Sequence, residues 1–273
     1  MAKVKLTGKV AVITGSSRGI GKAIAIDLAK QGVSIVLNGR NQERLDEAKV
    51  AVEKVHNKVI TVCCDISEKD AGKNLIQSAI GHFGQLDILV NNVGVSNRGN
   101  VGESDPEVFK KVFASNLFGA VNPTIAAIPE LRKTKGSIVF ISSLAGIRGI
   151  PGMSAYCSSK MALRAVAESI RLEEKAHDIH VGLILVGITQ IEHNKEAIAA
   201  DGSMQTLEKR DHKKGVQTME YVASVVTKNI RKRKFIYTLT GIGKLNSFMQ
   251  ARFPILVEKI ILKNLHKFEE RRQ

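Results

Sequence analysis

The chain has 273 residues, of which 44% are hydrophobic and 25% charged, an ordinary globular composition that excludes disordered and collagen-like proteins. No apolar run approaches the ~18 residues of a membrane span, and a strand-like run begins at once at Lys9, so we expect a cytoplasmic protein without a signal peptide. The net charge of +15 lies mainly in the tail, because sixteen Lys and Arg face six Asp and Glu from Gln205 onward, an excess of ten.

Short apolar runs alternate with longer segments of helical periodicity along the chain. Each run is continuous rather than alternating, which is typical of strands that are buried on both faces. Strand and helix in turn predict βαβ units and a single doubly wound (Rossmann) α/β domain over residues 1–273, with a central parallel sheet of about seven strands flanked by helices. The runs are residues 9–15, 34–39, 58–64, 86–92, 137–143, 180–186 and, more weakly, 235–239.

Between Ile191 and Thr218 the alternation weakens, and glycines and mixed charge replace it. This composition predicts a long mobile connection, of the kind that often forms a lid in a compact enzyme.

A glycine-rich turn, TGSSRGIG at residues 14–21, follows the first run and precedes a helical pattern. Glycine allows close approach of the backbone to a phosphate, and the helix start supplies free N–H groups and the positive end of the dipole. Such glycines also occur where a strand and a helix merely pack, but the position in the first βαβ unit favours a dinucleotide site. The cofactor contacts predicted in this turn are Gly15, Ser17, Arg18, Gly19, Ile20 and Gly21.

The second run ends at Gly39, where an NAD-binding protein would place an acid that holds the ribose hydroxyls. The acid is absent, and the guanidinium groups of Arg18 and Arg40 suit a 2′-phosphate, which predicts NADP (NADPH) rather than NAD. The alternative is that both arginines are solvated surface charges, as is usual in loops.

The stretch ISSLAGIRGIPGMSAYCSSK, residues 141–160, contains Ser143 at a strand end, then Tyr156 and Lys160 at helical spacing. At i and i+4 the last two side chains share a helix face, where the ammonium group would stabilise a phenolate and lower the pKa of Tyr156. Ser143 would hold a carbonyl oxygen while Tyr156 donates a proton to it. Alone, a Tyr-x-x-x-Lys spacing is mostly a surface pair, so its weight comes from the motifs that precede it.

The order of these motifs resembles that of the short-chain dehydrogenase/reductase (SDR) family over residues 9–186. The motifs are the glycine turn, NNVG at residues 91–94, Asn116, Ser143 and the Tyr–Lys pair. The resemblance implies hydride transfer between a nicotinamide ring and a carbonyl or carbinol carbon. It makes Asn116, Ser143, Tyr156 and Lys160 the catalytic tetrad, with Asn116 supporting a proton relay to Lys160 through water. It implies cofactor contacts at Asp65, Ile66, Asn92, Gly94, Tyr156, Lys160, Gly187 and Thr189 as well.

The family spacing also selects among neighbours, since it favours Ser143 over Ser142 and Asn116 over Asn122. The sequence departs from the pattern after the sixth run, where Val186 replaces the usual Pro and Ile191 the usual Thr. Either Thr189 takes over the contact to the nicotinamide carboxamide, or that contact is lost.

The basic tail predicts a helical extension over about residues 242–273. Past Pro254 its apolar side is Val257, Ile260, Ile261, Leu265 and Phe268, opposite Lys259, Lys263, His266 and Glu270. Such a helix docks on the body or on a second subunit, or attaches to an anionic membrane surface as a peripheral contact. The resemblance implies a homodimer or homotetramer. We expect no nucleic-acid partner and no metal, since no motif accompanies the basic run at 231–234 and the histidines lack ligand spacing.

The leading hypothesis is an NADPH-dependent oxidoreductase that reduces an apolar or lipid-like ketone to a secondary alcohol. Residues 142–163 resemble family members that act on bulky hydrophobic substrates, such as the ketosphinganine reductases and 11-beta-hydroxysteroid dehydrogenases. One alternative is a 3-oxoacyl carrier-protein reductase, whose acidic carrier would suit a basic protein. The other is a non-catalytic NADP-binding regulatory protein, which would not need the Tyr–Lys pair.

Overall fold

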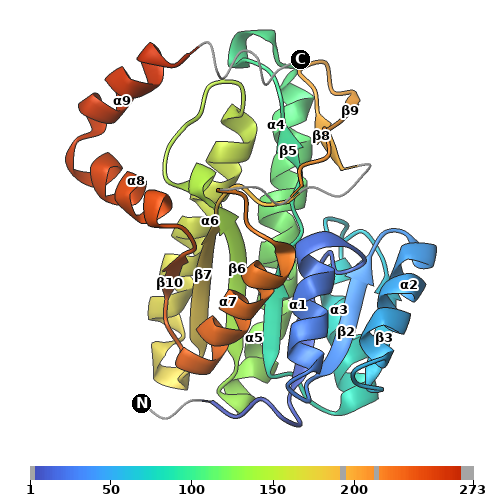
Figure 1. Ribbon diagram of the computed structural model, residues 1–273. Helices are drawn as coiled ribbons and strands as arrows, with labels where there is room; N and C mark the ends of the chain where they lie inside the picture. The colour runs from blue at the N-terminus through green and yellow to red at the C-terminus, as the bar shows by residue number, and fades with distance from the viewer. Residues whose placement is uncertain (1–3, 191–194, 212–214, 266–273) are drawn as a thin grey trace.

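The structure, a computed structural model, describes residues 4–190, 195–211 and 215–265. Among these residues seven parallel strands form the central sheet, in the order β10-β7-β6-β4-β1-β2-β3 (Figure 1). All seven expected runs form strands, so the predicted doubly wound α/β fold is confirmed. The strands are β1 (Val10–Ile13), β2 (Ser34–Gly39), β3 (Val59–Cys63), β4 (Ile88–Asn91), β6 (Ser137–Ser143), β7 (His180–Val186) and β10 (Ile236–Thr238).

Helices cover both faces of this sheet and enclose two hydrophobic cores. Strands β1, β2, β4 and β7 are buried along their whole length, whereas the edge strands β3 and β10 are partly exposed. This burial explains why the inner runs are apolar throughout. One face packs against α1 (Gly19–Ala29), α2 (Gln42–Glu53) and α7 (Met219–Lys232), and the other against α3 (Ala71–Phe83), α5 (Gly119–Thr134) and α6 (Ser154–Glu173).

The order of the strands reverses beside β1, which has β2 on one side and β4 on the other. The chain passes from β1 to β2 and β3, and then crosses to β4 in the opposite direction along the sheet. In open α/β sheets, ligands bind outside the carboxyl ends of the strands at such a point.

The helix that precedes β6 is long because α4 (Pro106–Phe113), a π-helical turn at Ala114–Phe118 and α5 run on continuously. This run, Pro106–Thr134, is long and apolar enough to cross a membrane by length and composition. It packs against α3 and α6 and contributes to the core, so we interpret it as an interior helix.

The predicted connection between residues 191 and 218 is more regular than expected in its described part. There β8 (Glu196–Ile198) pairs antiparallel with β9 (Met204–Thr206) and parallel with β5 (Ser96–Asn97), which forms a small second sheet. Residues 191–194 and 212–214 lie outside the described residues. Short 3₁₀ turns at Val101–Glu103, Leu144–Gly146 and Lys175–His177 complete the described elements.

The basic tail forms two helices where the sequence predicts one extension. After β10, α8 (Gly241–Arg252) ends at Phe253, and α9 (Pro254–Lys263) begins with Pro254 at its first position, which suits proline because that N–H has no partner in a helix. Both helices project from the β10 side of the molecule (Figure 1). Of the expected apolar side, Phe268 lies outside the described residues, as do His266 and Glu270. The single-domain organisation stays a prediction.

Candidate active site

The glycine turn brings the start of α1 against the backbone that follows β1. Gly15 and Gly19 adopt φ values of +61° and +59°, a region that favours glycine. At Gly21 an added Cβ would collide with the carbonyl oxygen of Gly15 and lie 2.6 Å from Asn92 Nδ2. Only glycine therefore fits this close approach of the helix start to the turn, at the place where a phosphate would bind.

Two asparagine side chains, one from β2 and one directly after β4, hold this turn in shape. Asn92 Nδ2 donates to the carbonyl oxygens of Thr14 and Gly15, at 3.1 and 2.9 Å. From β2, the Asn38 Oδ1 atom accepts from the Gly15 N–H at 3.3 Å. Asn92, predicted as a cofactor contact, thus supports the turn from below, and Asn38 is a supporting residue that sequence reasoning missed. The sequence signal that could have found Asn38 is a polar Asn within an apolar run, because a buried amide needs hydrogen-bond partners.

The end of β2 lies beside the glycine turn, as the prediction of a cofactor site requires. A Cβ at Gly39 would be 3.0 Å from Ser17 Oγ, so Ser17 lies against the place of the absent acid. Arg40 is 77% exposed and its Nη1 atom lies 3.3 Å from Asp65 Oδ2, across the end of β3. Ile66, next to Asp65, is buried in the core.

Asp65 is ionised. Burial alone would raise the pKa of this carboxyl, but hydrogen bonds from the hydroxyl and the N–H of Ser67, together with the charge of Arg40, hold it below its usual range. Arg40 is therefore a mostly solvated cation with one exposed ion pair. Arg18, in the turn itself, is partly buried.

Ser143 and Tyr156 meet at the carboxyl edge of the sheet. The Ser143 side chain acts on the phenol of Tyr156 and lowers its pKa, and Ser143 Oγ accepts from the Ala145 N–H at 3.2 Å. The neighbouring Ser142 is buried on the other face of β6, and its Oγ lies 3.5 Å from the carbonyl oxygen of Lys160. The structure thus places Ser143, and not Ser142, against the phenol.

Tyr156 does not show the pKa that the sequence suggests. Burial raises its pKa, and the hydrogen bond from Ser143 opposes this only in part. The expected lowering by Lys160 is not seen, because Lys160 Nζ lies 5.9 Å from the centre of the phenol ring and donates to the carbonyl oxygen of Ile141 at 3.0 Å. The phenol is therefore protonated at neutral pH.

Lys160 is one of the few lysines that the fold buries, with 4% of its surface exposed. Burial, helped by the positive charge of Lys195, lowers its pKa to about 8. The ammonium form still predominates at pH 7, but a base of this strength exchanges protons more readily than a solvated lysine.

Asn116 lies in the π-helical turn, fully buried beside Lys160. Its Oδ1 atom accepts from the Val95 N–H at 2.7 Å, and its Nδ2 atom donates to the Val95 carbonyl and to Ser159 Oγ, both at 2.9 Å. A Cβ at Gly94 would lie 3.2 Å from Lys160 Nζ and 3.3 Å from Asn116 Oδ1, so glycine leaves room for both. Because both N–H groups of the amide are used, the side chain has none left to donate to the water of the implied relay.

The backbone of Tyr156 is held on both sides by residues that sequence reasoning missed. Asn97, fully buried in β5, accepts from the Tyr156 N–H at 2.9 Å, where Met153, the residue before the helix, offers no capping side chain. Ser159 Oγ donates to the Tyr156 carbonyl at 2.8 Å and accepts from Asn116. No local pattern marks Asn97, because its contact is made across 59 positions of the sequence.

The segment after β7 closes against a loop that precedes α7. Gln217 accepts from the Gly187 N–H through Oε1 at 3.3 Å, and its backbone pairs with Ile188 and Gln190. Thr189 is buried at this edge, with its Oγ1 atom 3.3 Å from the Gly187 carbonyl. Val186, in place of the usual Pro, pairs in register with Ser143. Ile191 lies outside the described residues.

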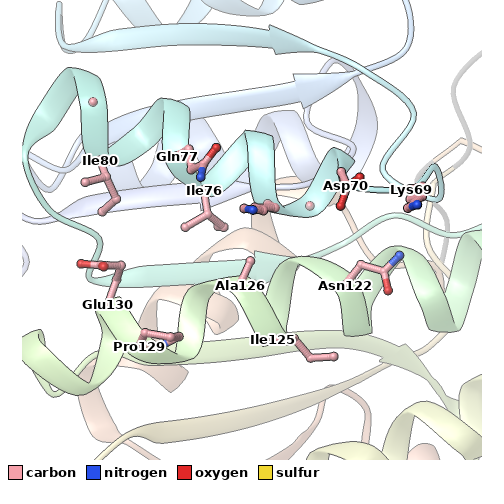
Figure 2. Close-up of a pocket in the computed structure, with 13 residues that line it drawn as sticks. Lys69, Asp70, Ile76, Gln77, Ile80, Asn122, Ile125, Ala126, Pro129 and Glu130 are labelled. Atoms are coloured by element: carbon pink, nitrogen blue, oxygen red, sulfur yellow. The ribbon is translucent and has the colours of Figure 1, made fainter.

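A groove of about 830 Å³ lies elsewhere, on the outer surface between α3 and α5. Figure 2 shows Ile76, Gln77 and Ile80 on one side and Asn122 and Ile125 on the other. It includes none of the residues predicted for catalysis or cofactor binding, and it is where Asn122, the rival of Asn116, lies. Within the described ranges, no group of three or more His, Cys, Asp or Glu is arranged to hold a metal ion.

The comparisons with known proteins agree with this geometry. The family described as short chain dehydrogenase matches residues 9–202. The 3-ketodihydrosphingosine reductase of Mus musculus is 39% identical over 182 residues, 64% of this chain and 55% of the mouse protein, so the chain spans about half the length of that relative. Dehydrogenase/reductase SDR family member 7B of Bos taurus is 30% identical over 265 residues, 94% of this chain and 82% of the bovine protein.

A solved structure of a short-chain dehydrogenase/reductase from Burkholderia phymatum, in complex with NAD, is similar in fold. It superposes with a TM-score of 0.80 at 21% identity, over 93% of this chain and 96% of that one. The fold, the arrangement at the carboxyl edge of the sheet and the family match over residues 9–202 together show that the chain belongs to the short-chain dehydrogenase family.

Proposed function

We propose that this chain is an NADPH-dependent oxidoreductase that reduces a ketone of an apolar, lipid-like substrate to a secondary alcohol. The observation that carries the proposal is the grouping of Ser143, Tyr156 and Lys160 at the carboxyl edge of the sheet, where Lys160 is buried with its Nζ atom 5.9 Å from the centre of the phenol ring. A regulatory protein that only binds the cofactor does not need this pair.

The site fits a dinucleotide. Gly15 and Gly21 allow the start of α1 to approach the turn after β1, Arg18 lies in that turn, and Arg40 and Asp65 lie at the ends of β2 and β3. When bound, NADPH would supply a hydride to the carbonyl carbon. Arg18 and Arg40 would hold the 2′-phosphate through charge-assisted bonds, since Gly39 offers no acid to repel it.

The residues of this chain would handle the proton. Ser143 holds the carbonyl oxygen of the substrate, and Tyr156 donates its hydroxyl proton to that oxygen as the carbon becomes tetrahedral. A phenol whose pKa is raised by burial is in the protonated state that reduction requires. Lys160, with its pKa of about 8, would then help to return a proton to the phenolate.

The substrate class is supported by similarity and by exposed apolar surface. The mouse relative carries the name 3-ketodihydrosphingosine reductase, and it matches 64% of this chain. Ile188, just past β7 at the carboxyl edge of the sheet, is 48% exposed, which suits an apolar substrate. We also expect a homodimer or homotetramer, which sedimentation of the purified chain tests.

The test is NADPH consumption with a panel of long-chain ketones and 3-oxoacyl thioesters, in wild type, Tyr156→Phe and Tyr221→Phe. General acid catalysis contributes about 10²–10⁴ in rate, so Tyr156→Phe lowers turnover by that order while NADPH binding is unchanged. Tyr221, on α7, makes only a 3.5 Å contact to the Leu239 carbonyl and is the matched control. Wild-type turnover in Tyr156→Phe contradicts the mechanism, and consumption with thioesters alone contradicts the substrate class.

A further inference from the structure

The exposed apolar side chains of the molecule are concentrated in its two last helices. Of the nineteen large apolar side chains that are exposed in the described residues, eight lie between Gly241 and Lys263. They are Ile242, Leu245, Phe248, Phe253, Ile255, Leu256, Ile260 and Leu262, with exposed fractions from 47% to 80%. Within α8 and α9, only Gly243 and Val257 are buried. We call the exposed side of these helices the α8–α9 surface.

Basic and apolar side chains share this surface. At ~100° per residue, Ile255, Leu256, Lys259, Ile260 and Lys263 fall within one arc of ~140° on α9, opposite Val257. Lys244 and Arg252 are exposed on α8. Against these four cations the two helices carry one acid, Glu258, so the surface is both apolar and positively charged.

We propose that the α8–α9 surface binds the surface of an anionic lipid membrane. A second copy of the chain is the weaker candidate, because the cores of protein interfaces are depleted in lysine, whereas Lys259 and Lys263 lie among the exposed apolar side chains. At a lipid surface, the same lysines extend to the phosphates while their stems and the neighbouring isoleucines contact the acyl chains. Anionic headgroups also match the excess of positive charge.

The surface begins next to the candidate active site. Thr240, two residues after β10, accepts from the Gly243 N–H at 2.9 Å and so caps α8. A Cβ at Gly243 would be 2.8 Å from Leu144 Cδ2, and Leu144 directly follows Ser143. The start of α8 therefore packs against the residue that follows Ser143, which places this end of the α8–α9 surface near the carboxyl end of β6. The proposal goes beyond the proposed function, and its test involves no catalytic step.

The experiment is co-sedimentation of the full chain with phosphatidylcholine vesicles, with and without a minor fraction of phosphatidylserine. We expect binding to the anionic vesicles that weakens when salt is raised from about 0.15 M to about 1 M, since the screening length falls from about 8 Å to about 3 Å. Each basic residue near an anionic surface contributes about a fivefold factor, so Lys259→Gln with Lys263→Gln weakens binding about 25-fold. Ile255→Gln with Ile260→Gln weakens binding by at least about tenfold.

The matched control is Lys54→Gln with Lys58→Gln, two exposed lysines near the far end of α2 that remove the same charge. This control should bind like wild type. Absence of binding to anionic vesicles, or equal weakening by the control and the α9 variants, overturns the proposal. A change of oligomeric state in Ile255→Gln with Ile260→Gln, without vesicle binding by wild type, assigns the surface to a second copy and overturns it as well.

Discussion

The burial of Lys160 predicts that Lys160→Met stabilises the fold while it impairs turnover. In the folded state burial lowers the pKa of this amine from 10.5 to about 8. At ~1.4 kcal/mol for each unit of pKa, keeping the ammonium charged in the folded state at pH 7 costs about 3 kcal/mol. The substitution removes this cost, but it also removes the hydrogen bond to the Ile141 carbonyl, which stabilises the fold by about 1–2 kcal/mol. The free energy of unfolding of Lys160→Met is therefore higher than that of wild type by about 1–2 kcal/mol.

The pH dependence separates this cause from a general packing effect. Because the unfolded state binds the proton more tightly, the cost is fully present below the folded pKa of about 8, and it fades as the pH rises toward 10.5. Between about pH 7 and about pH 9.5, wild type should therefore gain about 2 kcal/mol of stability relative to Lys160→Met.

The assay is urea unfolding of wild type and Lys160→Met at both pH values, with the exposed Lys54→Met as control. The control should leave the difference near zero at either pH. A difference between wild type and Lys160→Met that does not change with pH refutes the reasoning, and so does a Lys160→Met protein that is less stable at neutral pH. A stabilised but slow variant would show that the charge is kept for function at the expense of stability.

Three further predictions concern the turn, the cofactor and the helix of the phenol. Arg40→Ala lowers the preference for NADPH over NADH by about tenfold, since a charge-assisted bond contributes about 1.5–3 kcal/mol. The preference is measured as the ratio of the two dissociation constants in fluorescence titrations, and substitution of the exposed Arg44 in Arg44→Ala leaves this ratio unchanged. Gly21→Ala abolishes tight cofactor binding in the same titration, because its Cβ has no space; an unchanged affinity would mean that the turn does not hold the cofactor. Asn97→Ala lowers kcat more than it changes KM, because the Tyr156 N–H loses its acceptor. Asn97→Asp keeps that acceptor and retains most of the turnover. Equal loss of turnover in both variants would assign Asn97 a packing role only.

The sequence predicts the central sheet because its strands are buried on both faces, and burial leaves continuous apolar runs such as Ser137–Ser143. It does not predict the second sheet, whose strands have two or three residues and in which β5 pairs with β8 across about 100 positions. Such short strands carry no periodicity, and their partners are set by the tertiary fold. The division of the tail at Phe253 has a signal, Pro254, which starts α9.

For the site, the order of motifs predicts which side chains meet, and the structure brings Ser143 to Tyr156 as expected. The electrostatics follow from burial, which one-dimensional spacing does not contain. Thus Lys160 stands four residues from Tyr156, yet the pKa of the phenol is raised rather than lowered, because the enclosure of its hydroxyl is the larger effect. The supporting role of Asn97 depends on tertiary contacts in the same way.

The most direct test of the central claim is the fate of the hydride. NADPH in which deuterium replaces both hydrogens at the reactive carbon of the nicotinamide ring is incubated with the purified chain and a long-chain ketone, and the alcohol is examined by mass spectrometry. The account predicts an alcohol that carries the deuterium on its carbinol carbon, formed at a rate that falls by about 10²–10⁴ in Tyr156→Phe. An unlabelled alcohol, or labelled alcohol formed equally fast by Tyr156→Phe, would contradict it.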